Sequence, residues 1–200
     1  MGLSFRAAEA AFPAIAWPAH GPILAVMRRT SYGHMNCSIA AALDIVGEPW
    51  TFLIVRDALY GVRRFDDFQA NLGIARNVLT ARLKRLVEAG VFRRVAYQQR
   101  PLRYEYRLSE KGAALFPIII GLKEWGDRFG AAAEDGRPME LEDATNGHRV
   151  EPALVDLRTG RKLDLMGVRA VAGEGATAET RRFFERIAFE RATTRRVARS

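Results

Sequence analysis

The chain has 200 residues, of which 48% are hydrophobic, so it is long and apolar enough to fold around a core without disulfides or metals. This composition excludes wholesale disorder, and charges or prolines interrupt every stretch long enough to span a bilayer. The formal net charge is +8. Residues 28–133 carry 17 bases and 10 acids, whereas residues 134–200 carry 13 and 12. The surplus therefore lies in the middle segment, where we expect a polyanionic partner.

Cys37 is the one cysteine, which rules out an intramolecular disulfide and a CxxC metal pair. We therefore expect a reducing, cytoplasmic location, with no bound metal or cofactor. Residues 1–27 form a loose extension rich in alanine and proline, and prolines break its apolar run, which argues against a signal peptide. Met27 is a plausible alternative start, so we expect residues 1–26 to be either a dispensable extension or not part of the native protein.

Apolar residues at helical spacing predict four helices in the first part of the middle segment. They cover residues 37–46, 49–61, 66–72 and 76–89. Pro49 is expected in the first turn of the second helix, where its missing N–H would be unpaired anyway. The third and fourth helices are joined by a tight turn that contains Gly73, which is the order of a helix-turn-helix.

Two strands follow at residues 91–98 and 103–108, joined by a polar link that contains Arg100. A hairpin directly after the second helix of a helix-turn-helix forms a wing. Ser109 is expected to begin a long helix with a wide apolar face, and Pro117 is expected to kink it. The predicted fold class is mainly α (α+β), a winged helix-turn-helix with a two-stranded wing and dimerisation helices.

The chain changes character at Glu134, after which residues 134–149 are polar and loop-like. Residues 150–157 and 161–168 are predicted to form a second small hairpin, and Thr177 is predicted to cap a final helix that runs to about Arg191. The predicted organisation is therefore an extension at 1–27, a winged helix domain for binding and dimerisation at 28–133, and a C-terminal extension at 134–200 whose role the sequence does not define.

The helix at 76–89 has a leucine face and an opposite polar face. At about 100° per residue, Leu79, Leu83 and Leu86 fall opposite Asn77. A polar helix face of this kind fits the major groove of DNA, where arginine pairs with guanine, asparagine pairs with adenine, and small residues admit the backbone and touch thymine methyl groups. We assign base reading to Arg76, Asn77, Thr80 and Ala81.

Other basic residues suit phosphate contacts, which set orientation rather than sequence. These are Arg63, Arg64, Arg82, Lys84 and Arg85, together with Arg100 and Arg103 on the wing. The plainer alternatives are the solvated face of an ordinary amphipathic helix and a merely soluble loop. The tight turn before the helix and the basic hairpin after it favour DNA.

Motifs between residues 35 and 130 have an order and spacing that is highly specific when taken together. They are Cys37, Leu43, Gly47-x-x-Trp50, Ile54-x-Arg56-Asp57, Gly61-x-Arg63-Arg64-Phe65, Leu72-Gly73-Ile74, Leu79-x-x-Arg82-Leu83-x-x-Leu86, Gly90 and Tyr104-x-Tyr106-x-Leu108. This pattern closely resembles the HxlR-type winged helix-turn-helix regulators. The resemblance implies a dimeric bacterial DNA-binding regulator, which we expect to act as a repressor on a palindromic operator.

In such proteins the first helix and the long helix after the wing form the dimer. The residues that fit this role are Leu115, Ile118, Leu122 and Trp125, although the same stripe would serve an intramolecular core. Ala75 stands where relatives often carry a serine cap, at a cost of about 1 kcal/mol. Arg100-Pro101 replaces the Pro-Pro that many relatives carry at the wing. Residues 138–175 resemble an extension with cysteine pairs in some relatives, but without cysteines no metal site is expected.

Some similar regulators sense oxidants or electrophiles through the cysteine that Cys37 matches. A helix N-terminus favours the reactive thiolate, so Cys37 is a candidate sensor and a small molecule is a candidate effector. The alternative is a small, buried packing residue.

An enzyme is the main alternative class, but none of His20, His34 and His148 lies in a nucleophile, metal or phosphate-loop motif, so we expect no enzymatic activity. A protein-interaction module would not need the 12 bases, against 5 acids, between Arg56 and Arg107. RNA binding would require stacking aromatics on an exposed sheet, and glutamates weaken a membrane role for the last helix. The expected partners are double-stranded DNA, a second copy and an effector, with no membrane.

Overall fold

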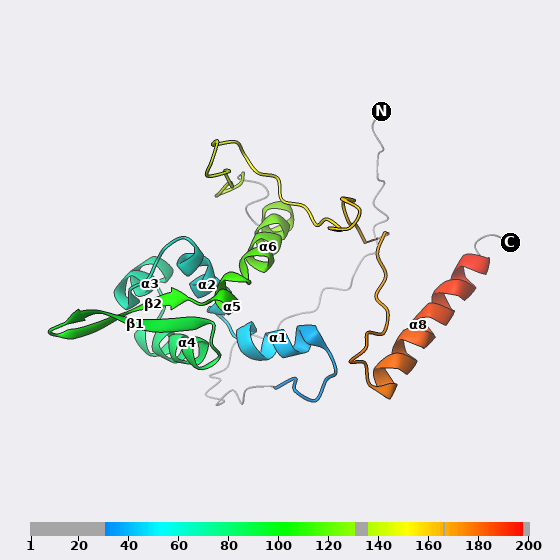
Figure 1. Cartoon of the computed structure of the whole chain (residues 1–200), viewed down its shortest axis with the longest axis horizontal. Helices are drawn as coiled ribbons and strands as arrows, with labels where there is room; N and C mark the ends of the chain where they lie inside the picture. The colour runs from blue at the N-terminus through cyan, green and yellow to red at the C-terminus, as the bar shows by residue number, and fades with distance from the viewer. Residues whose placement is uncertain (1–30, 131–135, 166, 198–200) are drawn as a thin grey trace, which may run out of the picture. The chain divides into compact units, whose positions relative to one another are not determined.

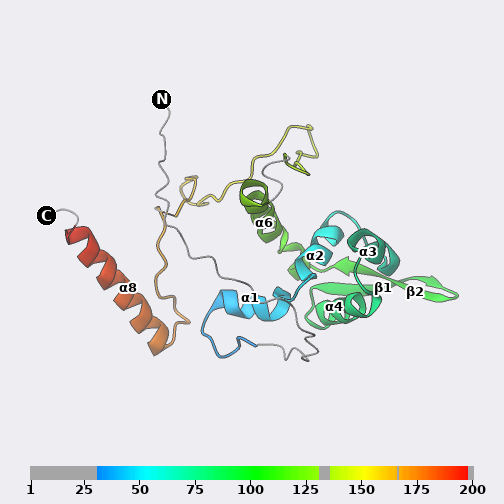
Figure 2. The same ribbon diagram turned by 180° about the vertical axis from the view of Figure 1, so that it is seen from behind.

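A computed structural model of the chain describes residues 31–130, 136–165 and 167–197 (Figure 1, and from behind in Figure 2). The expectations for residues 1–27 lie outside these described residues. The elements are α1 Ser38–Val46, α2 Thr51–Leu59, α3 Phe65–Leu72, α4 Arg76–Glu88, β1 Phe92–Gln99, β2 Leu102–Leu108, α5 Glu110–Ala113, α6 Phe116–Phe129 and α8 Ala178–Val197. This mixed α and β order, with one two-stranded sheet, confirms the predicted winged helix-turn-helix.

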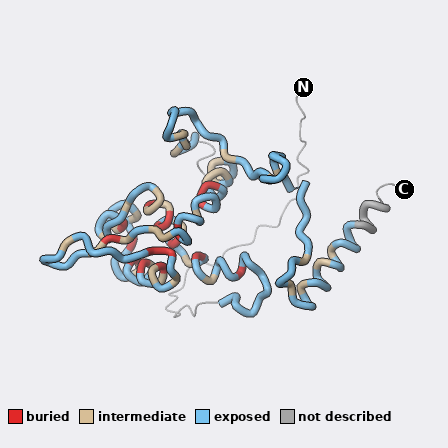
Figure 3. Tube along the Cα trace, viewed as in Figure 1, coloured by how far each residue is buried: buried red, intermediate tan, exposed pale blue. Residues whose placement is uncertain are grey.

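The hydrophobic core gathers between α2, α3, α4 and the base of the hairpin (Figure 3). Leu79, Leu83 and Leu86 of α4 are buried there, and the same cluster includes Ile54 of α2 and Phe68 of α3. Burying each leucine contributes roughly 2 kcal/mol. The predicted leucine face of α4 is therefore confirmed, and it anchors the helix along most of its length.

The start of α2 differs from the prediction. Pro49 precedes the helix rather than standing in its first turn, because Trp50 adopts a φ of 73°, outside the helical region. The resulting sharp turn between α1 and α2 leaves Glu48 in contact with α4. Among the described residues, no single helix is long and apolar enough to cross a membrane, although α1 and α2 meet the limits of length and composition jointly across an 81° bend.

The single helix predicted after the wing is in fact two helices, α5 and α6. Ser109 caps α5 as predicted, since its Oγ accepts a hydrogen bond from the Gly112 N–H at 3.1 Å. Pro117 stands in the first turn of α6. Proline has no N–H and its ring crowds the carbonyl four residues earlier, so an interior proline either kinks or breaks a helix. Pro117 therefore starts a new helix instead of kinking an existing one.

The two wing strands are antiparallel and lie within one residue of their predicted bounds. Arg100–Pro101 forms the turn between them. The outer edge of β2 also pairs with the segment before α3: the Tyr106 N–H donates to the Arg63 carbonyl at 2.7 Å, and Arg64 bridges Glu105. These backbone contacts attach the start of the helix-turn-helix to the wing.

The C-terminal extension contains two turns of the same design, Asp143–Gly147 and Asp156–Gly160. In each turn the glycine N–H donates to the aspartate carbonyl at 2.8 Å, and the glycine φ is 71° or 68°. The aspartate side chain accepts the N–H two residues further on, at 2.8 Å in the first turn and 3.0 Å in the second. The pKa of Asp143 is lowered mainly by a hydrogen bond from the Thr145 hydroxyl and then by the one from the Thr145 N–H. The pKa of Asp156 is lowered mainly by the hydrogen bond from the Arg158 N–H.

The hairpin predicted at residues 150–157 and 161–168 is corrected by this arrangement. The turn at Thr159-Gly160 is confirmed, but it closes one antiparallel bridge, between Val155 and Lys162, rather than two strands. A second bridge closes the earlier turn, in the segment predicted to be a loop. Extended strands need a face on which alternate apolar side chains pack. Leu157 and Leu165 are 96% and 90% exposed, so that support is missing.

The predicted cap of the last helix, α8, is confirmed. The Thr177 Oγ1 accepts the Thr180 N–H at 3.2 Å. Asn36 adds to this cap from far away in the sequence: its Oδ1 accepts the Thr177 N–H and the Thr180 hydroxyl, each at 3.0 Å, and its Nδ2 donates to the Gly175 carbonyl at 3.2 Å. The residue that precedes Cys37 is thus bonded to the start of α8.

Candidate nucleic-acid interface

The outward face of α4 carries the residues predicted to read bases. Arg76, Asn77, Thr80 and Ala81 are all exposed, as is Lys84, whereas the leucines on the other side are buried. The helix therefore presents small or polar side chains between a cation at each end, Arg76 and Lys84. Such a face can enter a major groove without displacing any part of the core.

The N-terminus of α4 lacks the usual side-chain cap, as predicted, because Ala75 occupies the cap position. Asn77 compensates in part, since its Oδ1 accepts the Val78 N–H at 2.9 Å. The Thr80 hydroxyl donates to the Arg76 carbonyl at 2.8 Å. The Asn77 side chain is therefore already engaged in a local hydrogen bond.

The side chain of Arg76, the first residue of α4, reaches back to α3. Its guanidinium stacks over the Phe65 ring, 4.7 Å from the centroid, and lies 3.6 Å from the Asp66 carboxylate. Both members of the ion pair are highly exposed, at 71% and 83%, so the pair itself contributes little to stability. The aromatic ring orients Arg76, while its charge stays available to a ligand.

Arg82 and Arg85 are engaged with Glu48 of the α1–α2 connection. Glu48 accepts from Arg82 at 2.7 Å and from Arg85, and Arg82 Nε also donates to the Pro49 carbonyl at 3.1 Å. The three charged side chains are only 21–32% exposed. We call this group of Glu48, Arg82 and Arg85 the Glu48 clamp. Its partners lie more than thirty positions apart in the sequence, so periodicity could not reveal it.

Lys84 contrasts with its two neighbours. Its side chain is 74% exposed, and its nearest acid is Glu88, at 3.8 Å. Arg63 and Arg64 are also exposed, and the Arg64 guanidinium lies over the Tyr97 ring at 4.7 Å. These three cations keep the freedom that a phosphate contact requires.

The wing presents its predicted basic residues at its tip. Arg100 and Arg103 are both exposed. Arg94 of β1, to which the sequence analysis assigned no role, stacks its guanidinium on the Tyr104 ring at 3.6 Å. A cross-strand cation–π contact of this kind stabilises the hairpin by up to about 1 kcal/mol at an exposed site.

Asp57, which the sequence analysis named only as part of a motif, holds α2 against α3. Its buried carboxylate accepts two hydrogen bonds from Arg56, at 2.9 and 2.7 Å, and one from Asn71 Nδ2 at 2.7 Å. Because Asn71 belongs to α3, this contact fixes α2 against the first helix of the helix-turn-helix. It thereby helps to position α4.

The residues predicted for dimerisation divide into two groups. Leu115 is half-buried and packs against the core of its own chain. Ile118, Leu122 and Trp125 are 46%, 48% and 63% exposed, and Phe129 continues their line at 61%. We call these last four residues the α6 stripe. Leu115 therefore has an intramolecular role, whereas the α6 stripe leaves apolar surface open.

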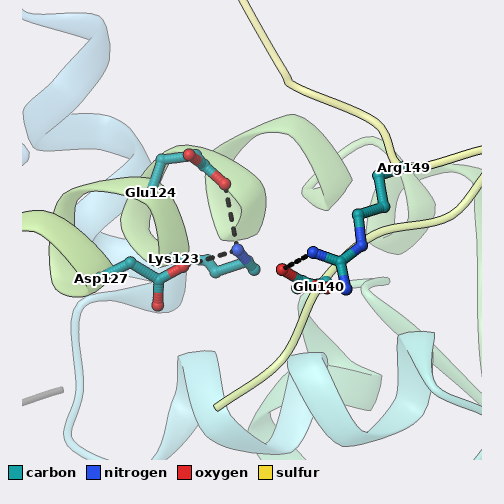
Figure 4. A network of polar contacts seen from close by, with 5 residues as sticks. All are labelled: Lys123, Glu124, Asp127, Glu140 and Arg149. Carbon is teal, nitrogen blue, oxygen red and sulfur yellow. Dashed lines mark hydrogen bonds and ion pairs between the residues drawn. The ribbon is translucent and has the colours of Figure 1, made fainter. Parts of the chain in front are cut away.

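Another face of α6 is already occupied by charges (Figure 4). The Lys123 Nζ donates to Asp127 at 2.7 Å and to Glu124 at 3.0 Å, and its side chain is only 11% exposed. The hydrogen bond to Asp127 raises the pKa of Lys123 above its ordinary value of 10.5. In the extension, Arg149 pairs with Glu140 at 2.7 Å. The charges of Lys123, Glu124 and Asp127 are thus paired within the chain, whereas the α6 stripe is exposed.

Cys37 stands at the N-cap position of α1, with a φ of −146°, and its side chain makes no cap hydrogen bond. It is exposed. The buried packing role considered as an alternative therefore does not describe this single chain.

The elements and their exposed basic residues define a winged helix-turn-helix protein. The model of the HxlR-like helix-turn-helix family matches residues 45–134. The HTH-type transcriptional regulator Rv3095 of Mycobacterium tuberculosis is 43% identical over 142 residues, which cover 71% of this chain and 89% of the relative.

Two solved structures are also similar to this chain over nearly three quarters of its length. PA1607, described as a transcription factor, has a TM-score of 0.64 and 36% identity, covering 72% of this chain and all of the other. PA1374 from Pseudomonas aeruginosa, described in the same way, has a TM-score of 0.53 and 42% identity, covering 73% and 99%. The chain belongs to the HxlR-like helix-turn-helix family. It is a transcriptional regulator and not an enzyme.

Proposed function

We propose that the protein is a repressor that binds a palindromic operator as a homodimer, with one α4 in the major groove of each half-site. The observation that carries the proposal is the anchored helix itself. Three buried leucines fix α4 on the core, while its polar side is fully accessible. A two-fold dimer would separate the two reading helices by about one turn of DNA, roughly 10 base pairs.

The described contacts support a division of labour among the basic residues. Arg76, Asn77, Thr80 and Ala81 read base edges, and the wing residues Arg100 and Arg103 contact the backbone or the minor groove. Arg63, Arg64 and Lys84 bind phosphates, because their charges are exposed and not committed to a close carboxylate. Arg82 and Arg85, first considered for phosphates, instead hold α4 in place through the Glu48 clamp.

The dimer would use apolar surface that the single chain leaves open. The α6 stripe is one part of it, and Ile39 and Leu43 of α1, at 72% and 40% exposure, are another. Replacing Leu122 and Trp125 by alanine should shift sedimentation from dimer to monomer, while Leu115→Ala should mainly lower stability. A dimer that survives the first change would remove the α6 stripe from the interface.

Selection of bound fragments from a random DNA pool tests the proposal as a whole. We expect an enriched inverted repeat whose half-sites are centred roughly 10 base pairs apart. The matched control is the same selection with Asn77→Ala, which should enrich a site that is degenerate at one position in each half. Enrichment of no sequence by the unmodified protein would contradict operator recognition.

Cys37 supports an additional regulatory role in this proposal, in which an oxidant or electrophile alters DNA binding. Its exposure gives a reagent access, and it stands at the N-cap position of α1. Operator affinity measured before and after treatment with diamide should change in the native protein and stay constant in Cys37→Ser. An equal response in both proteins would eliminate the sensor role.

A further inference from the structure

A small cavity lies at the base of the wing, on the side of the sheet that faces α2. Its volume is about 250 Å³, and it is lined by Ala58, Arg63, Arg93, Tyr106, Arg107 and Leu108. The lining comes from the end of α2, the segment before α3 and both strands. No residue of α4, which packs against β1, is among the lining residues named above.

The charge in this cavity is out of balance. Arg93 and Arg107 stand directly opposite each other in the antiparallel ladder, an arrangement of like charges that weakens strand pairing. Glu105 offsets one of them, since it accepts from Arg107 Nε at 2.5 Å. Among the described residues, no carboxylate pairs with the guanidinium group of Arg63 or Arg93. Of the three guanidinium groups that line this cavity, only that of Arg107 has a carboxylate partner among the described residues.

We infer that this cavity binds a small organic carboxylate, whose oxygens are held by the arginines and whose body packs on the apolar lining. Arginine presents paired N–H groups that match a carboxylate. Ala58, Leu108 and the Tyr106 ring supply apolar surface beside them. A volume of about 250 Å³ lies at the small end for ligand pockets, which suits a small acid.

The position of the cavity links it to DNA binding. Arg63 lines the cavity and, under the proposed function on which this step rests, also contacts an operator phosphate. Its carbonyl accepts the Tyr106 N–H, so the loop before α3 and the wing meet at this point. A bound carboxylate would take Arg63 away from the phosphate, and operator affinity would fall.

Calorimetric titration of the full chain without DNA tests the site, with benzoate and inorganic phosphate as probes at constant ionic strength. We expect saturable binding of benzoate that weakens roughly tenfold or more in Arg93→Gln and in Arg107→Gln. The matched control is Arg137→Gln, an exposed arginine outside the cavity, which should bind as the native protein does. Absence of benzoate binding, binding of phosphate alone, or unchanged binding in both cavity variants would overturn the inference.

Operator affinity, measured on the same proteins without a probe, keeps this test separate from the proposed function. The cavity variants Arg93→Gln and Arg107→Gln should bind the operator within about twofold of the native protein, whereas Arg64→Gln should bind more weakly. If both cavity variants lose as much affinity as Arg64→Gln, these arginines serve DNA phosphates and the carboxylate site is wrong. Failure of the native protein to bind any operator would refute the proposed function and leave the benzoate result standing.

Discussion

Replacing Glu48 tests whether Arg82 and Arg85 hold α4 in place, in contrast to Lys84, which is proposed to contact phosphate. In Glu48→Gln the side chain keeps its size but loses the charge that Arg82 and Arg85 share. Both arginines are at most 32% exposed, so solvent replaces the lost interaction only in part. A fully exposed pair contributes about 0.2–1 kcal/mol, and a hydrogen bond to a charged group about 1.5–3 kcal/mol. We therefore expect a loss of about 2 kcal/mol in the free energy of unfolding.

Urea denaturation of the full chain measures this loss directly, and Arg82→Gln should produce a loss of similar size. Lys84→Gln is the matched control, because its side chain is 74% exposed and lies outside the Glu48 clamp. It should unfold at the native urea concentration. Its effect should appear instead in the salt dependence of operator binding, whose slope falls by about 0.9 for each phosphate that the protein no longer neutralises. The slope for Arg82→Gln should match the native protein. A native unfolding midpoint for Glu48→Gln, or equal slopes for Arg82→Gln and Lys84→Gln, would refute this division of roles.

Three further results are expected. Asp57→Ala leaves Arg56 without its carboxylate partner and should lower the free energy of unfolding by roughly 3 kcal/mol in urea melts; a loss below about 1 kcal/mol would contradict it. Gly112→Ala would place a Cβ against the Val91 carbonyl oxygen, so the same melts should show a loss of about 2 kcal/mol, and native stability would mean that α5 shifts freely. Asp143 and Asp156 have lowered pKa values, so their turns are stabilised above pH 3.8, and this is lost as the pH falls through the lowered values. NMR titration of the two carboxyl groups should give midpoints below 3.8, and ordinary midpoints would rule out the turn hydrogen bonds.

The parts of the fold that could be predicted depend on short sequence intervals. The leucines of α4 recur at helical spacing, and the wing strands are bounded by a glycine and a proline, so their limits follow from local periodicity. The sequence showed that Pro117 would interrupt a helix. Whether it bends that helix or starts a new one depends on the packing of α5 against the wing.

The parts that could not be predicted depend on contacts between distant segments. Glu48 meets α4 only because Trp50 adopts a left-handed conformation, which no local pattern in the sequence indicates. Asn36 reaches the start of α8 across most of the chain. The residues proposed to read bases could be chosen from the helical periodicity alone. That Arg82 is held by Glu48 while Lys84 is exposed could be seen only in the folded chain.

The central claim is that the exposed side of α4 reads bases, and Asn77 tests it most directly. Affinity for an operator and for each of its single base-pair variants should be measured with Asn77→Ala and with Lys84→Ala. We expect Asn77→Ala to lose about 1–3 kcal/mol of discrimination at one base pair in each half-site, and Lys84→Ala to weaken every site by the same factor. Equal losses on every site for both variants, or native discrimination by Asn77→Ala, would contradict base reading by α4.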